Sequence, residues 1–328
     1  MKSNLLLTLL FSFCFLLGCK NEKAPAADQG GDSIADLEKA IETTLDKTKA
    51  QQLTALYQQY IDGHPEDKVT NASYLYKTAS LYARQNQYPA AATTLMNVLV
   101  NYKGSEVEAS SLHLLGDLYK DNLNYPALGQ DLLHFLSGNY PNYKETAAVK
   151  KSLQGNAKPL ADRINEIASS IYDEETKLPN ARMARKYITA CEVNALISPN
   201  DPMAAELLLK AATTARTTAR NAQRALNIYD WVYTQFPGYE KAYQALFLKA
   251  FTLDNDMKKF DEAKGFYQEF LNKYPNDEFA VSTKFLLDNL GKSDDEIIKQ
   301  FEKKKGKSDD ETNKQLEKKN LGESEKKK

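Results

Sequence analysis

Histidine and cysteine are the side chains best suited to acid–base, nucleophilic or metal chemistry near neutral pH, and this chain of 328 residues has three of each. His64 lies in a predicted turn, whereas His113 and His134 lie in predicted helices. No HExxH helix, nucleophile elbow, phosphate-binding loop or EF-hand loop is present. We therefore predict that the protein is not an enzyme, with no catalytic residues, no cofactor and no metal site.

Two acidic pairs are the remaining candidates for cation ligands. Asp294-Asp295 and Asp309-Asp310 belong to the same hexapeptide, Gly-Lys-Ser-Asp-Asp-Glu, which begins at residue 291 and again at residue 306. Each copy contains Ser-x-x-Glu, the capping box that starts a helix, and carboxylates in a first helical turn interact favourably with the helix dipole. We interpret the pairs as helix starts rather than as metal ligands.

One thiol does lie in a sequence that predicts covalent chemistry. Lys2 precedes the apolar run Leu5–Gly18, which suits a signal-peptide core and is too short for a comfortable membrane span. The run ends in Leu16-Leu17-Gly18-Cys19, where a small residue fits the groove of a peptidase and the Cys19 thiol is the nucleophile to be alkylated.

These residues resemble the lipobox of bacterial lipoproteins. The resemblance implies cleavage after residue 18 and attachment of lipid, such as palmitate, at Cys19, which would anchor the chain to a membrane without spanning it. Lys20 after the cysteine is compatible with the outer membrane, since in enterobacterial lipoproteins Asp at this position favours the inner membrane. An ordinary secretory signal with an incidental cysteine is the alternative.

Composition limits the functions open to the rest of the chain. The formal net charge of −1 gives no sign of nucleic-acid binding, because the basic excess is confined to the C-terminal tail. With Cys14 in the signal and Cys19 lipidated, Cys191 is left alone, which excludes a disulfide framework; we expect it to be a small buried apolar residue. We divide the chain into a signal peptide (1–18), a flexible tether (19–32), a helical body (33–304) and a charged, mobile tail (305–328).

The body is organised by a repeat with a step of about 38 residues, within the range of helical solenoids. Ala225, Tyr229, Val232 and Phe236-Pro237 recur as Ala263, Tyr267, Phe270 and Tyr274-Pro275. Offsets of four and three place the small and aromatic residues on one helical stripe, and proline ends the helix. Such a helix needs a neighbour of its own kind to pack against, so the repeat predicts a stack of helix pairs.

An earlier stretch carries the fuller pattern Ala79, Tyr82, Tyr88, Ala91, Leu95 and Val98, with a second copy at Gly116, Tyr119, Tyr125, Leu128, Leu132 and Phe135. This pattern resembles the tetratricopeptide repeat (TPR), with Leu128 at the position where the family has alanine. The resemblance implies an all-α fold, a right-handed TPR-like superhelix (α-solenoid) of about six helix pairs. Across residues 142–198 the repeats fall out of phase, and we expect one degenerate pair there, with helices over 160–172 and 180–197.

In the TPR family, ligands bind the concave face formed by the first helix of each pair. Carried onto this chain residue by residue, that face predicts a partner-binding set of aromatic, basic and histidine side chains: Tyr76, Arg84, His113, Lys120, Arg216, Phe247 and Phe251. Aromatic residues and arginine are common anchors of protein interfaces. A solvated mixed face is the alternative.

Together these features predict a lipid-anchored scaffold or adaptor of the cell envelope, at the outer membrane and facing the periplasm, that binds protein partners in its groove. It would be similar to the TPR proteins of outer-membrane assembly and of the Tol–Pal system. The alternative is a glycan-capturing outer-membrane lipoprotein, but such chains carry exposed tryptophans, whereas the single tryptophan here, Trp231, lies in a predicted packing helix.

Overall fold

The computed structural model describes residues 33–153, 155, 158–293 and 295–300. The predictions for the signal peptide 1–18, for Cys19, for the tether 19–32 and for the tail 305–328 lie outside these residues. The chain forms two compact units, divided after Leu53. Within the described residues the fold is helical, with no strand and a single antiparallel bridge between Tyr172 and Pro179.

Two helices precede the clear repeats. Helix α1 (Ile34–Ala40) begins at a capping box, in which the Ser33 hydroxyl accepts a hydrogen bond from the Asp36 amide at 3.2 Å and the Asp36 carboxylate accepts one from the Ser33 amide. It ends at Ala40. Helix α2 (Lys47–Gly63) comes next in the chain.

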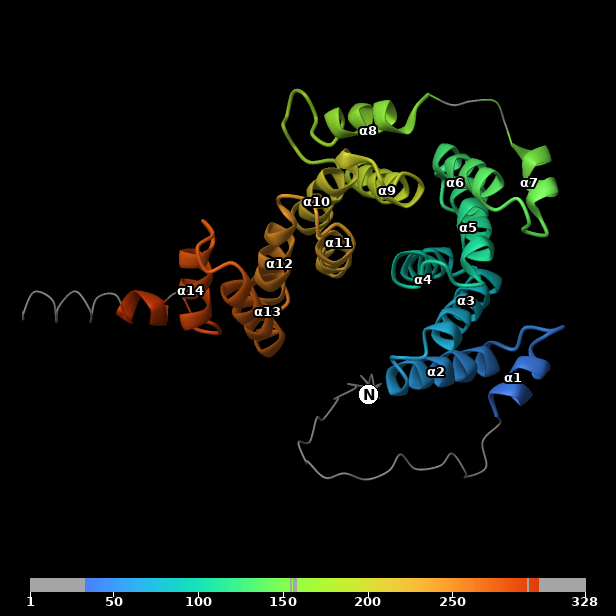
Figure 1. The fold of residues 1–328 in the computed structure, drawn as a ribbon, viewed down its shortest axis with the longest axis horizontal. Coiled ribbons are helices and arrows are strands. Elements are labelled where there is room, and N and C mark those ends of the chain that lie inside the picture. The colour runs from blue at the N-terminus through green and yellow to red at the C-terminus, as the bar shows by residue number, and fades with distance from the viewer. Residues whose placement is uncertain (1–32, 154, 156–157, 294, 301–328) are drawn as a thin grey trace, which may run out of the picture. The chain divides into compact units, whose positions relative to one another are not determined.

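Five helix pairs follow in the described residues, and a further helix begins a sixth (Figure 1). The first helix of each pair is α3 (Lys68–Arg84), α5 (Glu108–Asp117) with the π-helical turn η1 (Leu118–Asn122), α8 (Leu160–Ser169), α10 (Pro202–Thr217), and α12 (Ala242–Phe251) with the π-helical turn η2 (Thr252–Asp256). Their second helices are α4 (Tyr88–Asn101), α6 (Pro126–Asn139), α9 (Ala181–Ile197), α11 (Ala222–Gln235) and α13 (Phe260–Lys273). Helix α7 (Thr146–Ser152) lies between α6 and α8, and α14 (Ala280–Asp288) is the sixth start.

The second helices recur along the chain with the spacing that the sequence repeat predicts. Helices α4 and α6 start one predicted step apart, as do α11 and α13, and all four have 14 residues. Each is preceded at a distance of two positions by a residue with positive φ: Asn86, Asn124, Arg220 and Lys258. This left-handed residue turns the chain from the first helix into the second in every one of these pairs.

Small residues let the paired helices approach each other closely. In the second pair the contact joins Gly116 and Gly129, and a Cβ atom added to Gly129 would lie 2.4 Å from the carbonyl oxygen of Gly116. Gly129 is the fourth residue of α6, as Ala91, Ala225 and Ala263 are of their helices, so the small position is Gly129 and not the predicted Leu128.

The predicted register in the second pair was wrong by one because η1 contains an extra residue. Ala79 lies seven positions before its left-handed residue Asn86, whereas Gly116 lies eight positions before Asn124. A π-helical turn accommodates such a residue without ending the helix. Equivalent residues of the first and second pairs are therefore one position further apart in the sequence after η1 than before it.

The middle of the chain is where the two series of repeats meet. The first residue of α7 lies one repeat step after the first residue of α5, but α7 ends after two turns. The last residue of α9 lies one repeat step before the last residue of α11. The helix expected over 180–197 is present as α9, and the one expected over 160–172 is present as α8 but ends at Ser169. Because α7 is short, the second helices α6 and α9 contact each other directly (Figure 1).

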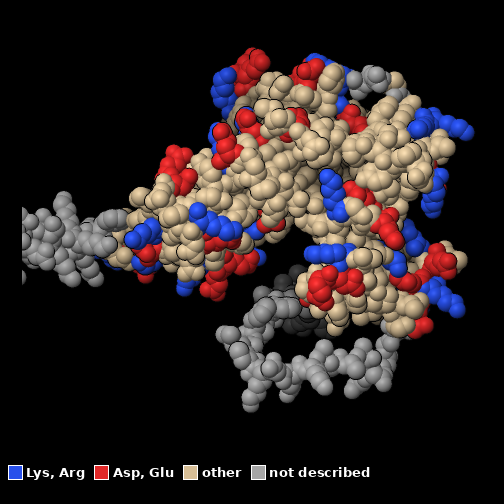
Figure 2. Space-filling view, in the orientation of Figure 1, with Lys and Arg blue, Asp and Glu red and all other residues tan. Residues whose placement is uncertain are grey.

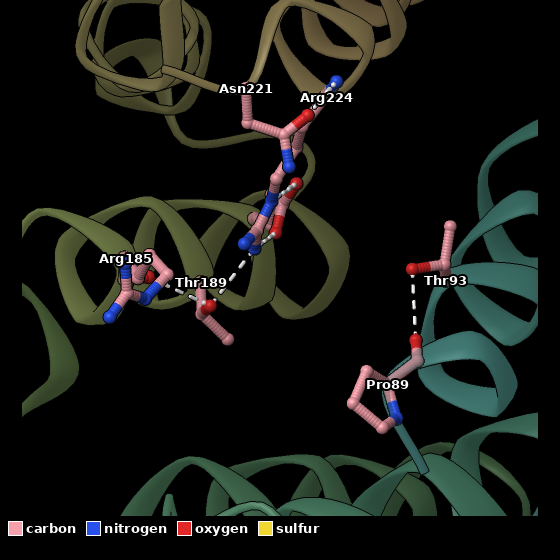
Figure 3. Close-up of polar contacts among 7 residues, drawn as sticks. Pro89, Thr93, Arg185, Thr189, Asn221 and Arg224 are labelled. Carbon is pink, nitrogen blue, oxygen red and sulfur yellow. Dashed lines mark hydrogen bonds and ion pairs between the residues drawn. The ribbon is translucent and has the colours of Figure 1, made fainter. Parts of the chain in front are cut away.

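A buried ion pair fixes α11 on α9 (Figure 3). The Arg224 guanidinium donates through Nε to the Glu192 carboxylate at 3.1 Å, forms a second bond to it through Nη2, and donates to Thr189 Oγ1 at 2.9 Å. Arg224 also follows the N-cap of its helix, Asn221, whose side chain accepts from the Arg224 amide. The Glu192 side chain is only 8% exposed, so its carboxylate is shielded from water, whereas the Arg224 side chain is 28% exposed.

Candidate partner-binding surface

The predicted binding residues all lie in the first helices of pairs, as expected, but they differ in exposure. Arg84 is exposed at the end of α3, two positions before the left-handed Asn86. Tyr76 in α3, His113 in α5 and Lys120 in η1 are partly exposed. The remaining three residues of the set lie in α10 and α12.

His113 is the centre of a polar cluster in the second pair. Its Nδ1 lies 3.0 Å from the Tyr143 hydroxyl, and its Nε2 lies 3.4 Å from the Asp117 carboxylate one turn further along α5. The Lys120 ammonium is 3.2 Å from the same carboxylate. We call Tyr76, His113, Asp117, Lys120 and Tyr143 the histidine cluster. Both ring nitrogens of its histidine are engaged, which fixes the plane of the ring.

Tyr143 joins the histidine cluster from the turn that follows α6. Burial is the main cause that raises the pKa of its hydroxyl, the Ser110 side chain acts in the opposite direction through a hydrogen bond, and nearby Tyr76 adds to the rise. The phenol is therefore neutral at physiological pH and can both donate and accept a hydrogen bond. This suits recognition of polar backbone or side-chain groups rather than nucleophilic chemistry.

Arg216 and Phe251 form a second cluster, between α10 and η2. The Arg216 guanidinium lies 5.2 Å from the centre of the Phe251 ring and its Nη1 is 3.3 Å from the Asp256 carboxylate. The buried Nε of Arg216 has no hydrogen-bond partner among the described residues. We call Arg216, Phe251 and Asp256 the arginine cluster. It combines a cation held over an aromatic face with a carboxylate that fixes the cation in place.

Phe247 is a correction to the predicted set. Its side chain is 8% exposed, and its ring packs against Phe279 at 4.9 Å and Phe270 at 5.9 Å between ring centres. The cause is geometric, because this face of α12 is covered by α13 and by the residue that precedes α14. Phe247 belongs to the core of the fifth pair and offers nothing to a partner.

Sequence reasoning missed Tyr143 and Asp256. Tyr143 lies outside the first helices, in the turn after α6, so the family's pattern gave no reason to include it. Asp256 was missed because it lies at the end of η2, which continues the first helix of the fifth pair beyond α12. The signal that was available is the charge complementarity between Asp256 and Arg216 in the preceding pair.

A hollow lies where α6 meets α9, and Lys120 of the histidine cluster forms part of its wall. One cavity of about 1220 Å³ is lined by η1, by α6, by the last residue of α7, by described residues between α7 and α8, and by the end of α9. A neighbouring cavity of about 590 Å³ shares three of its lining residues, Phe135, Ile197 and Ser198. We call the two adjoining cavities the junction groove.

Metal-binding side chains and the remaining thiol are further candidates for chemistry in the described part of the chain. This part of the chain contains no group of three or more histidine, cysteine or carboxylate side chains placed to hold a metal ion. Cys191 is buried in α9, and burial raises the pKa of its thiol to about 12. None of the helices in the described ranges combines the length and hydrophobicity of a membrane span. On the face shown in Figure 2, acidic and basic side chains are interspersed.

Comparison with known proteins agrees with the helix pairs. A family model described as "Tetratricopeptide repeat" matches residues 73–105 and 244–277, which correspond to the first and the fifth pair. A search of curated proteins found no match. The chain thus contains tetratricopeptide repeats at these two places, and its fold is an all-α, TPR-like solenoid.

Proposed function

We propose that this protein is a lipid-anchored scaffold of the cell envelope that binds protein partners through the histidine and arginine clusters and Arg84. Tetratricopeptide repeats support the coarser part, a protein-interaction scaffold. The observation that carries the proposal is the arginine cluster, because a partly exposed guanidinium held over an aromatic ring is a common anchor of protein interfaces.

The anchoring part of the proposal rests on the sequence Leu16-Leu17-Gly18-Cys19. Lipid on Cys19 would place the scaffold on the outer membrane, facing the periplasm, and would restrict its partners to the envelope. The glycan-binding alternative gains no support, since the single tryptophan, Trp231, is 7% exposed and packs in the core.

Fractionation of cells tests the anchor. The Cys19→Ala variant should leave the membrane fraction, whereas Cys191→Ala should remain in it because that thiol is buried in the fold. A Cys19→Ala protein that still sediments with membranes, and is extracted only by detergent, would contradict the lipoprotein assignment.

Co-purification from detergent-solubilised envelopes tests the binding surface. Arg84→Ala and Arg216→Ala should each reduce recovery of the envelope proteins that co-purify with the wild type, with little change in melting temperature for Arg84→Ala. Lys264→Ala, an exposed change on the second helix α13, is the matched control and should recover them in full. Equal recovery with all three variants would rule out this surface.

A further inference from the structure

We infer that the partner segment bound at the arginine cluster extends onto the neighbouring edge of the third and fourth pairs, where Tyr172 and Arg220 contact it. We call Tyr172, Thr218 and Arg220 the edge surface. It fits a protein segment that places a carboxylate on Arg220 beside an apolar side chain on the Tyr172 ring. The inference rests on the proposed function and enlarges its binding site. The edge surface shares no lining residue with the junction groove.

The third pair has the longest connection between the two helices of a pair in the described part of the chain. Helix α8 ends at Ser169 and α9 begins at Ala181, so residues 170–180 join them. In the other four pairs the second helix begins within five positions of the end of the first. Insertions in a repeat protein lie in loops along one face of the stack, which is often the binding face. The insertion therefore makes this edge a candidate surface.

The inserted loop is closed by its own hydrogen bonds. The Asp173 amide donates to the Leu178 carbonyl at 3.0 Å, and the Asn180 amide donates to the Ile171 carbonyl at 2.7 Å. The Asp173 carboxylate accepts from the amide and the hydroxyl of Thr176 at 2.8 and 2.9 Å. Ile171 is buried and anchors the loop in the core. The loop thus presents its side chains in fixed places, which lowers the entropy cost of binding.

Tyr172 is an aromatic side chain that this loop holds out to solvent. It is 52% exposed, although its backbone pairs with Pro179 across the loop. Its hydroxyl lies 3.5 Å from Oγ1 of Thr218, which follows the last residue of α10. Thr218 is two positions beyond Arg216 in the chain, so the loop of the third pair reaches the fourth pair beside the arginine cluster. Exposed tyrosine and arginine side chains are frequent anchors of protein interfaces.

Arg220 is a cation available to a partner on this edge. Its side chain is exposed and forms no ion pair with another described residue, whereas Arg216 is already paired with Asp256. Its backbone is left-handed, with a φ of 51°, at the position where the first two pairs have asparagine. Asparagine adopts this conformation more readily than arginine. An arginine held against the preference of its backbone is typical of a functional position.

The acidic residues of the loop do not compete for Arg220. The Asp173 carboxylate is bound within its own turn. Glu174 and Glu175 lie at the tip of the loop, beyond the bridge that Tyr172 makes. A partner carboxylate therefore meets an unpaired guanidinium near the base of the loop and is repelled at its tip. This arrangement favours an acidic segment that runs from the base of the loop towards the arginine cluster.

The test measures binding of a peptide with this chemistry. The probe is a fluorescein-labelled peptide of three Gly-Glu-Leu-Ser repeats, titrated with the purified full chain and followed by anisotropy. We expect saturable binding that added salt weakens, because charges contribute to it. Tyr172→Ala and Arg220→Asn should each weaken it at least about fivefold. Tyr172→Phe, which keeps the ring, should restore most of the affinity lost in Tyr172→Ala.

Three controls separate the edge surface from general effects. Leu178→Ala changes a 66% exposed side chain of the same loop that lies on the face opposite Tyr172, because side chains alternate along paired segments, and it should leave the affinity unchanged. The same peptide with lysine in place of glutamate should not bind. Arg220→Asn should keep or raise the melting temperature, since asparagine suits the left-handed backbone, whereas loss of a purely structural arginine would lower it.

Recovery of envelope proteins distinguishes this inference from the proposed function. If Arg216→Ala reduces their recovery and Tyr172→Ala does not, the arginine cluster binds without the edge surface and the inference is wrong. If neither variant reduces recovery, the proposed function is wrong as well. Absence of saturable peptide binding up to about 1 mM, or unchanged affinity in both Tyr172→Ala and Arg220→Asn, also overturns the inference.

Discussion

Two glycines decide how closely the helices of the second pair can pack. Gly116 and Gly129 meet where the other pairs have alanine, so their backbones approach each other more closely than a side chain would allow. Glycine lowers the intrinsic stability of a helix by about 1 kcal/mol relative to alanine. Both glycines are therefore retained against the local preference of the helix, and the packing they permit must offset that cost.

Gly129→Ala should destabilise the protein although alanine favours helix. The new Cβ would meet the Gly116 oxygen at 2.4 Å and the Lys120 amide nitrogen at 2.7 Å, both of them backbone atoms that cannot move aside. We expect a loss of roughly 1–3 kcal/mol in the free energy of unfolding, measured by urea denaturation.

Gly138→Ala is the matched control, because Gly138 lies in the same helix α6 with no atom within 4 Å of an added Cβ. It should raise stability by up to about 1 kcal/mol. A Gly129→Ala protein as stable as Gly138→Ala would show that the two helices are not in close contact.

The burial of Cys191 predicts how the reactivity of its thiol at a given pH depends on folding. Burial raises the pKa of its thiol to about 12, above the ordinary range, so the reactive thiolate is scarce in the folded state from about pH 7 to pH 9. Iodoacetamide at about pH 8 should leave residue 191 unmodified in the native protein and alkylate it after unfolding in urea, as located by peptide mass spectrometry. Alkylation of the folded protein at a rate near that of a free cysteine would contradict the burial.

At the scale of elements, the ion pair between α9 and α11 should show a strong asymmetry between single and double changes. Arg224→Met leaves the Glu192 carboxylate buried without its partner, which should cost about 3–5 kcal/mol. Replacing both residues, with Glu192→Leu added, should recover most of that loss, because the buried charge is then gone. A double-mutant cycle by thermal or urea unfolding measures the coupling, and simple additivity would mean that the pair does not join the two helices.

The buried stripes of the second helices were predictable because their signal is periodic. Ala225, Tyr229, Ala263 and Tyr267 all lie fully buried on their stripes, as the spacing predicts. A π-helical turn has no comparable pattern, since it adds one residue without changing the apolar face. The register of the second pair, which depends on η1, was for this reason predicted wrongly.

The binding surface was less predictable than the fold. A family pattern says which helix faces a ligand, but whether a side chain on it is free depends on the next elements of the stack. Phe247 is buried in the core because Phe279 and α13 cover it. Tyr143 joins the histidine cluster, although it was not predicted, because a turn from outside the first helices reaches His113. The proposed binding role of the remaining residues stays a prediction.

At the scale of the whole chain, contacts between successive helices dominate the repeats. In the fourth and fifth pairs α10 packs with α11, α11 with α12, and α12 with α13. Stability in such a stack is a sum over units and their immediate interfaces. A local defect is then expected to loosen its own pair and the adjoining one before it reaches distant pairs.

Ala263→Leu tests this locality. Ala263 is fully buried, so the larger side chain should overpack the fifth pair and lower its stability by about 1–3 kcal/mol. Native-state hydrogen exchange should become faster in α12 and α13 while the amides of α3 and α4 keep their wild-type rates. Uniform acceleration in all pairs would indicate one cooperative unit instead.

Because the second helices recur at a common step, the chain can change in length by whole repeats. Excising residues 222–259 would join Asn221 to Phe260, so that the left-handed turn of one pair leads directly into the second helix of the next without a shift of frame. The same cut across α7 to α9 has no such solution, because the interval from Asn124 to Arg220 is not a whole number of repeat steps. Duplication or loss of whole repeats can therefore lengthen or shorten the chain on either side of α7 to α9. The region from α7 to α9 itself can only be kept or lost as one piece.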